Sequence, residues 1–199
     1  SYDGIDYTST ADPATVSSFA LDRFEVSVGR FRAFVDAGKG TQASPPAAGD
    51  GAHPLIANSG WDAGWNMWLQ PNTTALRAAL TCSGWDTWTD APGGNETLPM
   101  NCVNWYESFA FCAWDGGRLP TEAEWNEAAA GGDEQRYYPW SAAFPPGSTT
   151  IDDTYAVYDS VPIYPVGSRS PKGDGRWGQA DLGGSMLEWN LDGYSTYSN

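Results

Sequence analysis

Three cysteines, one histidine and an excess of carboxylates are the side chains of this 199-residue sequence that could do chemistry. Cys82 and Cys102 lie on either side of a loop rich in Trp and Gly. The pair favours a disulfide, which would add roughly 3 kcal/mol in the chain-entropy model and imply an oxidising compartment. A metal-binding pair is the weaker alternative, because no C-x-x-C spacing is present. Cys112 falls in an apolar helical pattern, which predicts a buried thiol.

The residues that most familiar catalytic centres require are absent from this sequence. With His53 as the single histidine, a Ser/His/Asp centre, a Cys/His centre and a multi-histidine metal site are nearly excluded. We therefore expect His53 to be a loop residue. The sequence has no P-loop, no dinucleotide fingerprint and no zinc pattern. Glycosidase-type carboxylate pairs stay open, because acids are numerous. Asn72 and Asn95 each begin an N-glycosylation sequon.

The charge balance is strongly acidic. Ten Lys and Arg face 25 Asp and Glu, for a net charge of −15. This balance argues against nucleic acid and against anionic membranes as partners. It is compatible with a bound cation or a cationic partner, although a solvated acidic surface explains it as well. No apolar run is long enough to span a bilayer. Because the sequence starts at Ser1 without a signal peptide, we expect a mature or excised segment.

Capping signals predict three short helices. They start at Ser27, Asn104 and Thr121 and end near Gly38, Trp114 and Gly131. Glu107 and Glu124 stand three residues after their caps, which completes two capping boxes. The connection "DGGRLP" between the last two helices is short, so we expect these two helices to pack close together.

The rest of the chain predicts an α+β fold with much irregular backbone. Residues 1–16 are small and polar and indicate a tail or linker, and residues 17–199 are expected to form one domain. Residues 17–28 and the pieces after Tyr138 have the pattern of short strands, whereas residues 40–100 show no sustained period. With 23 Gly, 14 Pro and 11 Trp, aromatic rings rather than long elements should fill the interior. A disulfide and bound calcium are candidate stabilisers.

Several motifs, taken in order, resemble the formylglycine-generating enzyme family, also called the sulfatase-modifying-factor family. They are "FALDRFEVSVGRFRAFV", "LPMNCVNWYESFAFCAWDGGRLPTEAEWNEAAAGG", "YYPWS", "PVGS" and "DLGGSMLEWNLDGY", and they cover residues 17–194. The resemblance implies a variant C-type-lectin-like fold, sparse in regular structure and commonly stabilised by calcium. Complete members convert a sulfatase cysteine to formylglycine with oxygen and with copper held by a cysteine pair. Other members are domains of ergothioneine- or pyoverdine-pathway enzymes, or binding modules.

The family's copper-binding cysteines follow a "G-N-V-W-E-W" motif, which here reads "GSMLEW" from Gly184 to Trp189. No cysteine of this sequence occupies the matching position, so no catalytic residue is assigned. The favoured interpretation is a secreted, periplasmic or cell-surface module that binds a protein or small molecule, possibly a sulfatase, without oxidase chemistry. One alternative is an incomplete oxidase whose cysteine pair and copper lie beyond Asn199. Another is a domain of a sulfoxide synthase.

The resemblance also implies two calcium sites. One would use the Glu188 carboxylate with the carbonyls of Gly184 and Met186, although Ser185 and Leu187 replace the family Asn and Trp. The other would use the Val157 carbonyl. Its family Asn is missing, so Asp159 or Asp153 would have to supply the side-chain ligand.

Overall fold

The computed structural model describes residues 15–82, 84–143, 151–158 and 162–193. These residues form four α-helices in this order: α1 (Val28–Asp36), α2 (Thr73–Ala79), α3 (Trp105–Trp114) and α4 (Glu122–Ala130). The same part of the chain also contains two 3-10 helices, η1 (Ala63–Trp68) and η2 (Gly132–Glu134). The described residues contain no helix long and apolar enough to cross a membrane. The tail predicted for residues 1–16 lies almost entirely outside the described residues.

The predicted helices are present with their predicted caps. The Ser27 hydroxyl accepts the Arg30 N–H at the start of α1. Both capping boxes are complete, with Asn104 paired to Glu107 and Thr121 to Glu124. Helix α2 was not predicted. Its Asn72 cap accepts the N–H of Ala75, but seven residues are too few to show a clear helical period.

The prediction of short strands is wrong for the described residues, which contain only isolated β-bridges. Ser27 pairs with Pro99, and Thr41 pairs with Ser44 and Gln70. Around the first bridge, the Val28 N–H donates to Leu98 and the Met100 N–H donates to Val26. Extended segments therefore do meet, but over too few residues to make a sheet. The predicted α+β class is supported in its helices and in its large share of irregular backbone.

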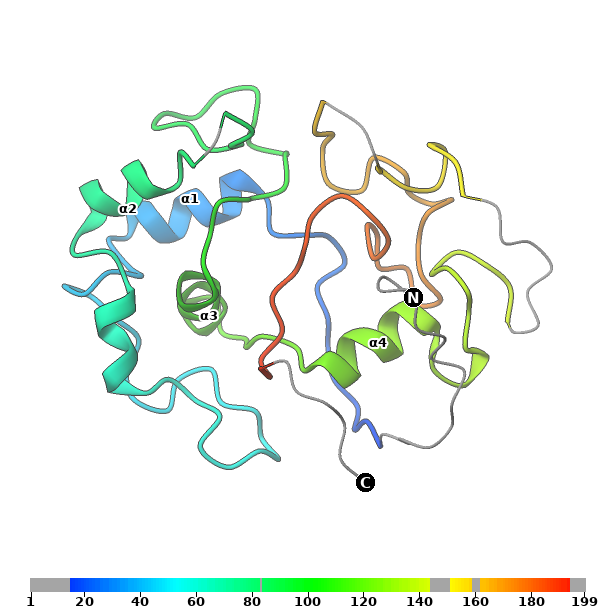
Figure 1. Cartoon of the computed structure of the whole chain (residues 1–199), viewed down its shortest axis with the longest axis horizontal. Helices are drawn as coiled ribbons and strands as arrows, with labels where there is room; N and C mark the ends of the chain where they lie inside the picture. The colour runs from blue at the N-terminus through cyan, green and yellow to red at the C-terminus, as the bar shows by residue number, and fades with distance from the viewer. Residues whose placement is uncertain (1–14, 83, 144–150, 159–161, 194–199) are drawn as a thin grey trace.

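Aromatic rings fill the main core, as the composition indicates. Helix α1 packs against α2 and α3, and Figure 1 shows these three helices gathered on one side of the molecule. Phe31 of α1 stacks on Phe111 of α3 with ring centroids 5.3 Å apart. Fourteen buried residues form this cluster: Val28, Phe31, Phe34, Val35, Trp61, Leu69, Leu76, Leu80, Trp88, Met100, Phe109, Ala110, Phe111 and Leu119.

Trp88 attaches a long loop to the helical core. Its ring lies 4.5 Å from the Arg32 guanidinium and 5.6 Å from that of Arg77. Arg32 is only 4% exposed, and it pairs with Glu96 at 2.8 Å. Two cation–π contacts and one sheltered ion pair thus hold residues 84–98 against α1 and α2.

Helices α3 and α4 do not pack together as expected, because the extended segment 188–191 runs between them (Figure 1). On the α3 side, the Trp105 indole donates to the Asn190 carbonyl at 2.7 Å. Near the start of α4, the Leu191 N–H donates to the Pro120 carbonyl at 2.7 Å. The two helices therefore contact segment 188–191 on both sides, and this segment begins with Glu188, one of the predicted metal ligands.

Candidate functional site

The turn "GGSMLE", residues 183–188, is held on one side by Val157. Gly184 and Ser185 both adopt left-handed backbone conformations, with φ of 99° and 61°. The Ser185 N–H donates to the Val157 carbonyl at 2.8 Å, and a Cβ at position 184 would overlap that carbonyl. Glycine is therefore required at 184. The structure brings Val157 to the same turn as Gly184 and Met186, although the resemblance assigns Val157 to a separate site. Asp159 lies outside the described residues.

Glu188 is connected to α4, the signature helix, which begins within the "GGRLPTEAEW" stretch. Its carboxylate accepts a hydrogen bond from the Trp125 indole N–H of α4. Loss of water around the carboxylate raises the pKa of Glu188, the Trp125 bond opposes this rise, and the nearby charge of Asp181 adds to it. The residue as a whole still has an exposed surface. Glu188 is thus positioned by α4 while part of it stays open to solvent.

Glu25 contacts the same turn from the opposite end of the chain. Its Oε2 accepts the Ser185 hydroxyl at 2.9 Å, and its Oε1 accepts the Met186 N–H at 3.1 Å. Burial raises the pKa of Glu25 to about 8; the Ser185 bond lowers it in part, and the charges of Asp181 and Glu188 raise it further. Glu25 was not among the site residues predicted from the sequence. The available signal was an acid between two apolar residues, Phe24 and Val26, in the predicted strand.

The donor atoms of this turn fit a hard cation. The Glu188 carboxylate and the carbonyls of Gly184 and Met186 are the oxygen ligands that calcium prefers. Glu25, Asp181 and Glu188 also have raised pKa values, chiefly because burial disfavours their charge; the charge of Asp181 adds to the rise at Glu25 and Glu188, and that of Asp174 to the rise at Asp181. Within the described part of the chain, however, no three His, Cys, Asp or Glu side chains are grouped as a metal site. A cation held here would rely on Glu188 and on backbone carbonyls.

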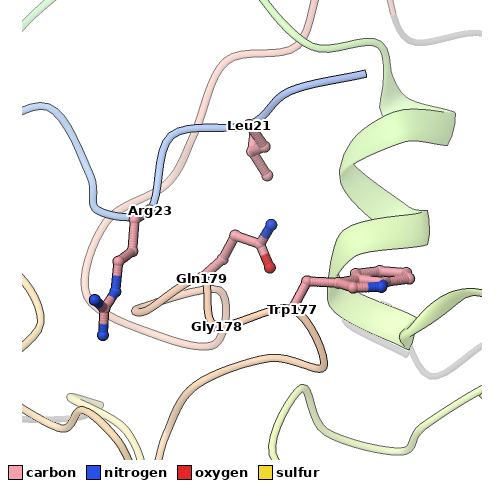
Figure 2. A pocket seen from close by; sticks show the side chains of 5 residues that line it. All are labelled: Leu21, Arg23, Trp177, Gly178 and Gln179. Carbon is pink, nitrogen blue, oxygen red and sulfur yellow. The ribbon is translucent and has the colours of Figure 1, made fainter. Parts of the chain in front are cut away.

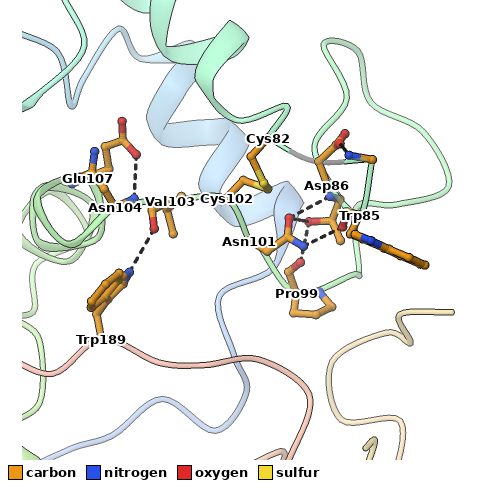
Figure 3. Close-up of a disulfide and its surroundings, with 12 residues drawn as sticks. Cys82, Trp85, Asp86, Pro99, Asn101, Cys102, Val103, Asn104, Glu107 and Trp189 are labelled. Carbon is orange, nitrogen blue, oxygen red and sulfur yellow. Dashed lines mark hydrogen bonds between the residues drawn. A yellow bond between two sulfur atoms is a disulfide. The ribbon is translucent and has the colours of Figure 1, made fainter. Parts of the chain in front are cut away.

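The cysteines occupy two separate chemical states. Cys82 and Cys102 form the predicted disulfide, with Cα atoms 5.7 Å apart. Figure 3 shows it beside the Asn101 amide, which donates to the Trp85 carbonyl at 2.9 Å and helps to fold the enclosed loop. Cys112 is a free, half-buried thiol. Burial, followed by the charge of Asp22, raises its pKa to about 12, so the thiol stays protonated near neutral pH.

His53 does not behave as an isolated loop residue. Its Nδ1 accepts the Leu55 N–H at 3.1 Å, and its Nε2 lies 3.4 Å from the Glu124 carboxylate. Arg118 donates two hydrogen bonds of 2.6 Å to the same carboxylate. Burial acts to raise the pKa of Glu124, but the Arg118 bonds, the Thr121 N–H and the charge of Arg118 lower it to about 2, with a smaller contribution from His53. Residues of "GGRLPTEAEW" thus form a buried charged group that anchors the His53 loop.

A shallow pocket of about 400 Å³ lies apart from the predicted site residues. It is lined by Leu21, Arg23, Trp177, Gly178 and Gln179. Figure 2 shows the Gln179 amide directed between Leu21 and Trp177, whereas Arg23 extends the other way. The Gln179 Oε1 is buried without a hydrogen-bond partner. The lining side chains do not converge on one point and do not single out a ligand.

Comparison with known proteins agrees with the resemblance. A family model described as a sulfatase-modifying factor enzyme 1-like domain matches residues 3–199. A formylglycine-generating enzyme of Thermomonospora curvata is 29% identical over 90% of this chain and 61% of its own length. An inactive C-alpha-formylglycine-generating enzyme 2 of Mus musculus is 30% identical over 96% of the chain and 64% of its own length. A hercynine oxygenase of Mycobacterium tuberculosis is 29% identical over 93% of the chain and 40% of its own length.

These relatives are longer than the sequence, which spans about three-fifths of the first two. The family model, in contrast, matches nearly every residue given. The aromatic core, the capped signature helix and the turn at Gly184–Glu188 all lie within the matched range. The chain therefore belongs to the sulfatase-modifying factor family, whose curated members include formylglycine-generating enzymes and an inactive homologue.

Proposed function

We propose that this sulfatase-modifying-factor domain acts as a binding or structural module. On this proposal, residues 1–199 do not carry out the copper oxidase reaction that depends on cysteine thiols. The observation that carries the proposal is the state of the cysteines. Cys82 and Cys102 are joined to each other, and burial raises the pKa of the third thiol, Cys112, to about 12. None of the three is a ready thiolate, which is the form of cysteine that binds metals.

The relatives support both this proposal and one rival. A homologue named as inactive is 30% identical to the chain, so the family contains members without the oxidase activity. The rival is a formylglycine-generating oxidase, dependent on copper and oxygen, whose cysteine pair lies in sequence beyond Asn199. It is favoured by the name of the Thermomonospora curvata relative, of which the chain covers 61%.

Copper titration distinguishes the binding-module proposal from the oxidase rival. Purified chain 1–199 should bind no stoichiometric Cu(I) in competition with a chromophoric chelator, and it should form no aldehyde on a cysteine peptide derived from a sulfatase. A Cys112→Ser variant serves as the control, because it removes the free thiol and keeps the disulfide. Tight binding of one Cu(I) that disappears in this variant would overturn the proposal. Activity that appears only when the reading frame is extended past Asn199 would establish the rival.

We further propose that the domain adopts the C-type-lectin-like variant fold and carries structural calcium. Glu188 and the carbonyls of Gly184 and Met186 would hold the cation, which would join the C-terminal turn to the rest of the domain. The disulfide supports export to a secreted, periplasmic or cell-surface location. The partner would be a protein or a small molecule, and a sulfatase is one candidate.

A further inference from the structure

We infer that Glu25 is a positioning residue for the cation site, setting the backbone of the turn that would supply its carbonyl ligands. This inference rests on the proposed calcium role of Gly184, Met186 and Glu188. It adds a residue from the N-terminal segment, 160 positions away from the turn, to a site otherwise built from one short stretch of sequence.

The hydrogen bonds of the turn show how its peptide groups are oriented. The Ser185 N–H points to the Val157 carbonyl. Because a trans peptide directs its N–H and C=O to opposite sides, the Gly184 carbonyl points away from Val157. The next peptide has its N–H on Met186, and this N–H points to Glu25 Oε1. Val157 therefore fixes the peptide that carries the first expected ligand, and Glu25 fixes the peptide between the two ligands.

Both carboxylate oxygens of Glu25 bind the turn at residues 185 and 186. Oε1 holds the Met186 N–H at 3.1 Å, and Oε2 holds the Ser185 hydroxyl at 2.9 Å. A carboxylate engaged in this way orients the turn rather than standing free as a ligand. Ser185 also needs the support, because a left-handed conformation, here with φ of 61°, is unfavourable for a residue with a side chain. Without Glu25, the peptide between the two carbonyls could rotate and change their relative direction.

Three single variants test this role by isothermal titration with calcium at fixed pH and salt. Glu25→Gln keeps the shape of the side chain but replaces one accepting oxygen with an N–H₂ group that faces the Ser185 and Met186 donors. Ser185→Ala removes one positioning bond without changing the charge. Asp22→Asn is the matched control, because it removes an acid from the same segment whose partner is Arg30. We expect calcium affinity to fall tenfold or more in Glu25→Gln and several-fold in Ser185→Ala, and to stay unchanged in Asp22→Asn.

Hydrogen exchange without calcium gives a readout that does not depend on the metal. The Met186 amide should exchange faster in Glu25→Gln than in the wild type. Wild-type affinity and exchange in both Glu25→Gln and Ser185→Ala would overturn the inference and leave the calcium proposal standing. A wild-type protein that binds no calcium would overturn the calcium proposal and this inference together. If Glu25→Gln does not fold, Ser185→Ala decides between these outcomes.

Discussion

Replacing Glu124 with Gln should destabilise the domain in a pH-dependent way. The residue is 4% exposed, and the pKa of its carboxylate, about 2, lies below the usual value of 4.5. A difference of about 2.5 units, at 1.36 kcal/mol per unit, corresponds to about 3 kcal/mol. Because the pKa is lower in the folded state, this stability is fully present above pH 4.5. It is lost as the pH falls from 4.5 through 2.

Urea unfolding followed by tryptophan fluorescence at pH 7, 4 and 2.5 measures this difference. At pH 7, Glu124→Gln should lose about 3 kcal/mol of unfolding free energy, because the Arg118 guanidinium stays buried without its anion. The loss should shrink at pH 4 and shrink further at pH 2.5, where the wild-type carboxylate also takes up protons. Glu127→Gln removes an acid from the same helix and should change stability by less than about 0.5 kcal/mol. A stability difference between the wild type and Glu124→Gln that is the same at all three pH values would refute the reasoning.

Four further outcomes are expected. Replacing Cys82 and Cys102 together with Ser should lower the unfolding free energy by about 3 kcal/mol; urea curves that overlay those of the oxidised wild type would contradict this. Cys112, with its pKa raised to about 12, should resist iodoacetamide at pH 8 in the folded protein and react in guanidinium, so equal labelling rates would be evidence against its burial. Trp88→Ala should cost about 3–5 kcal/mol through lost packing and lost cation–π contacts; a midpoint shift worth under 1 kcal/mol would show that the loop is held by other residues. The melting temperature should rise when millimolar calcium replaces a chelator, and an unchanged value would count against the cation role.

Local features were predicted well from the sequence. Both capping boxes need only a cap residue and an acid three positions later, and each is complete in the structure. The disulfide was also predicted, because Cys82 and Cys102 were the two cysteines outside helical patterns. Helix α2 was missed since its seven residues leave little periodicity to detect.

Long-range features could not be predicted in the same way. Residues 17–28 have the composition of a strand, but strand formation depends on a long partner segment, and the described residues provide one only around the bridge between Ser27 and Pro99. The contact of His53 with Glu124 joins a loop to the first turn of α4, and no sequence signal links the two. Glu25 meets Ser185 only after the whole domain has folded between them. For the candidate site, the motif gave the ligand turn, whereas the residues that orient it came only from the structure.

The bond between Glu25 and Ser185 has a consequence for synthesis on the ribosome. A nascent chain that ends before residue 185 has its N-terminal segment available but nothing for the Glu25 carboxylate to bind. Segment 188–191, which fills the space between α3 and α4, emerges later still. Closure of so long a span is intrinsically slow. Translation therefore delivers the contacts of this segment last, and until then the Trp105 indole lacks the Asn190 carbonyl that accepts its hydrogen bond.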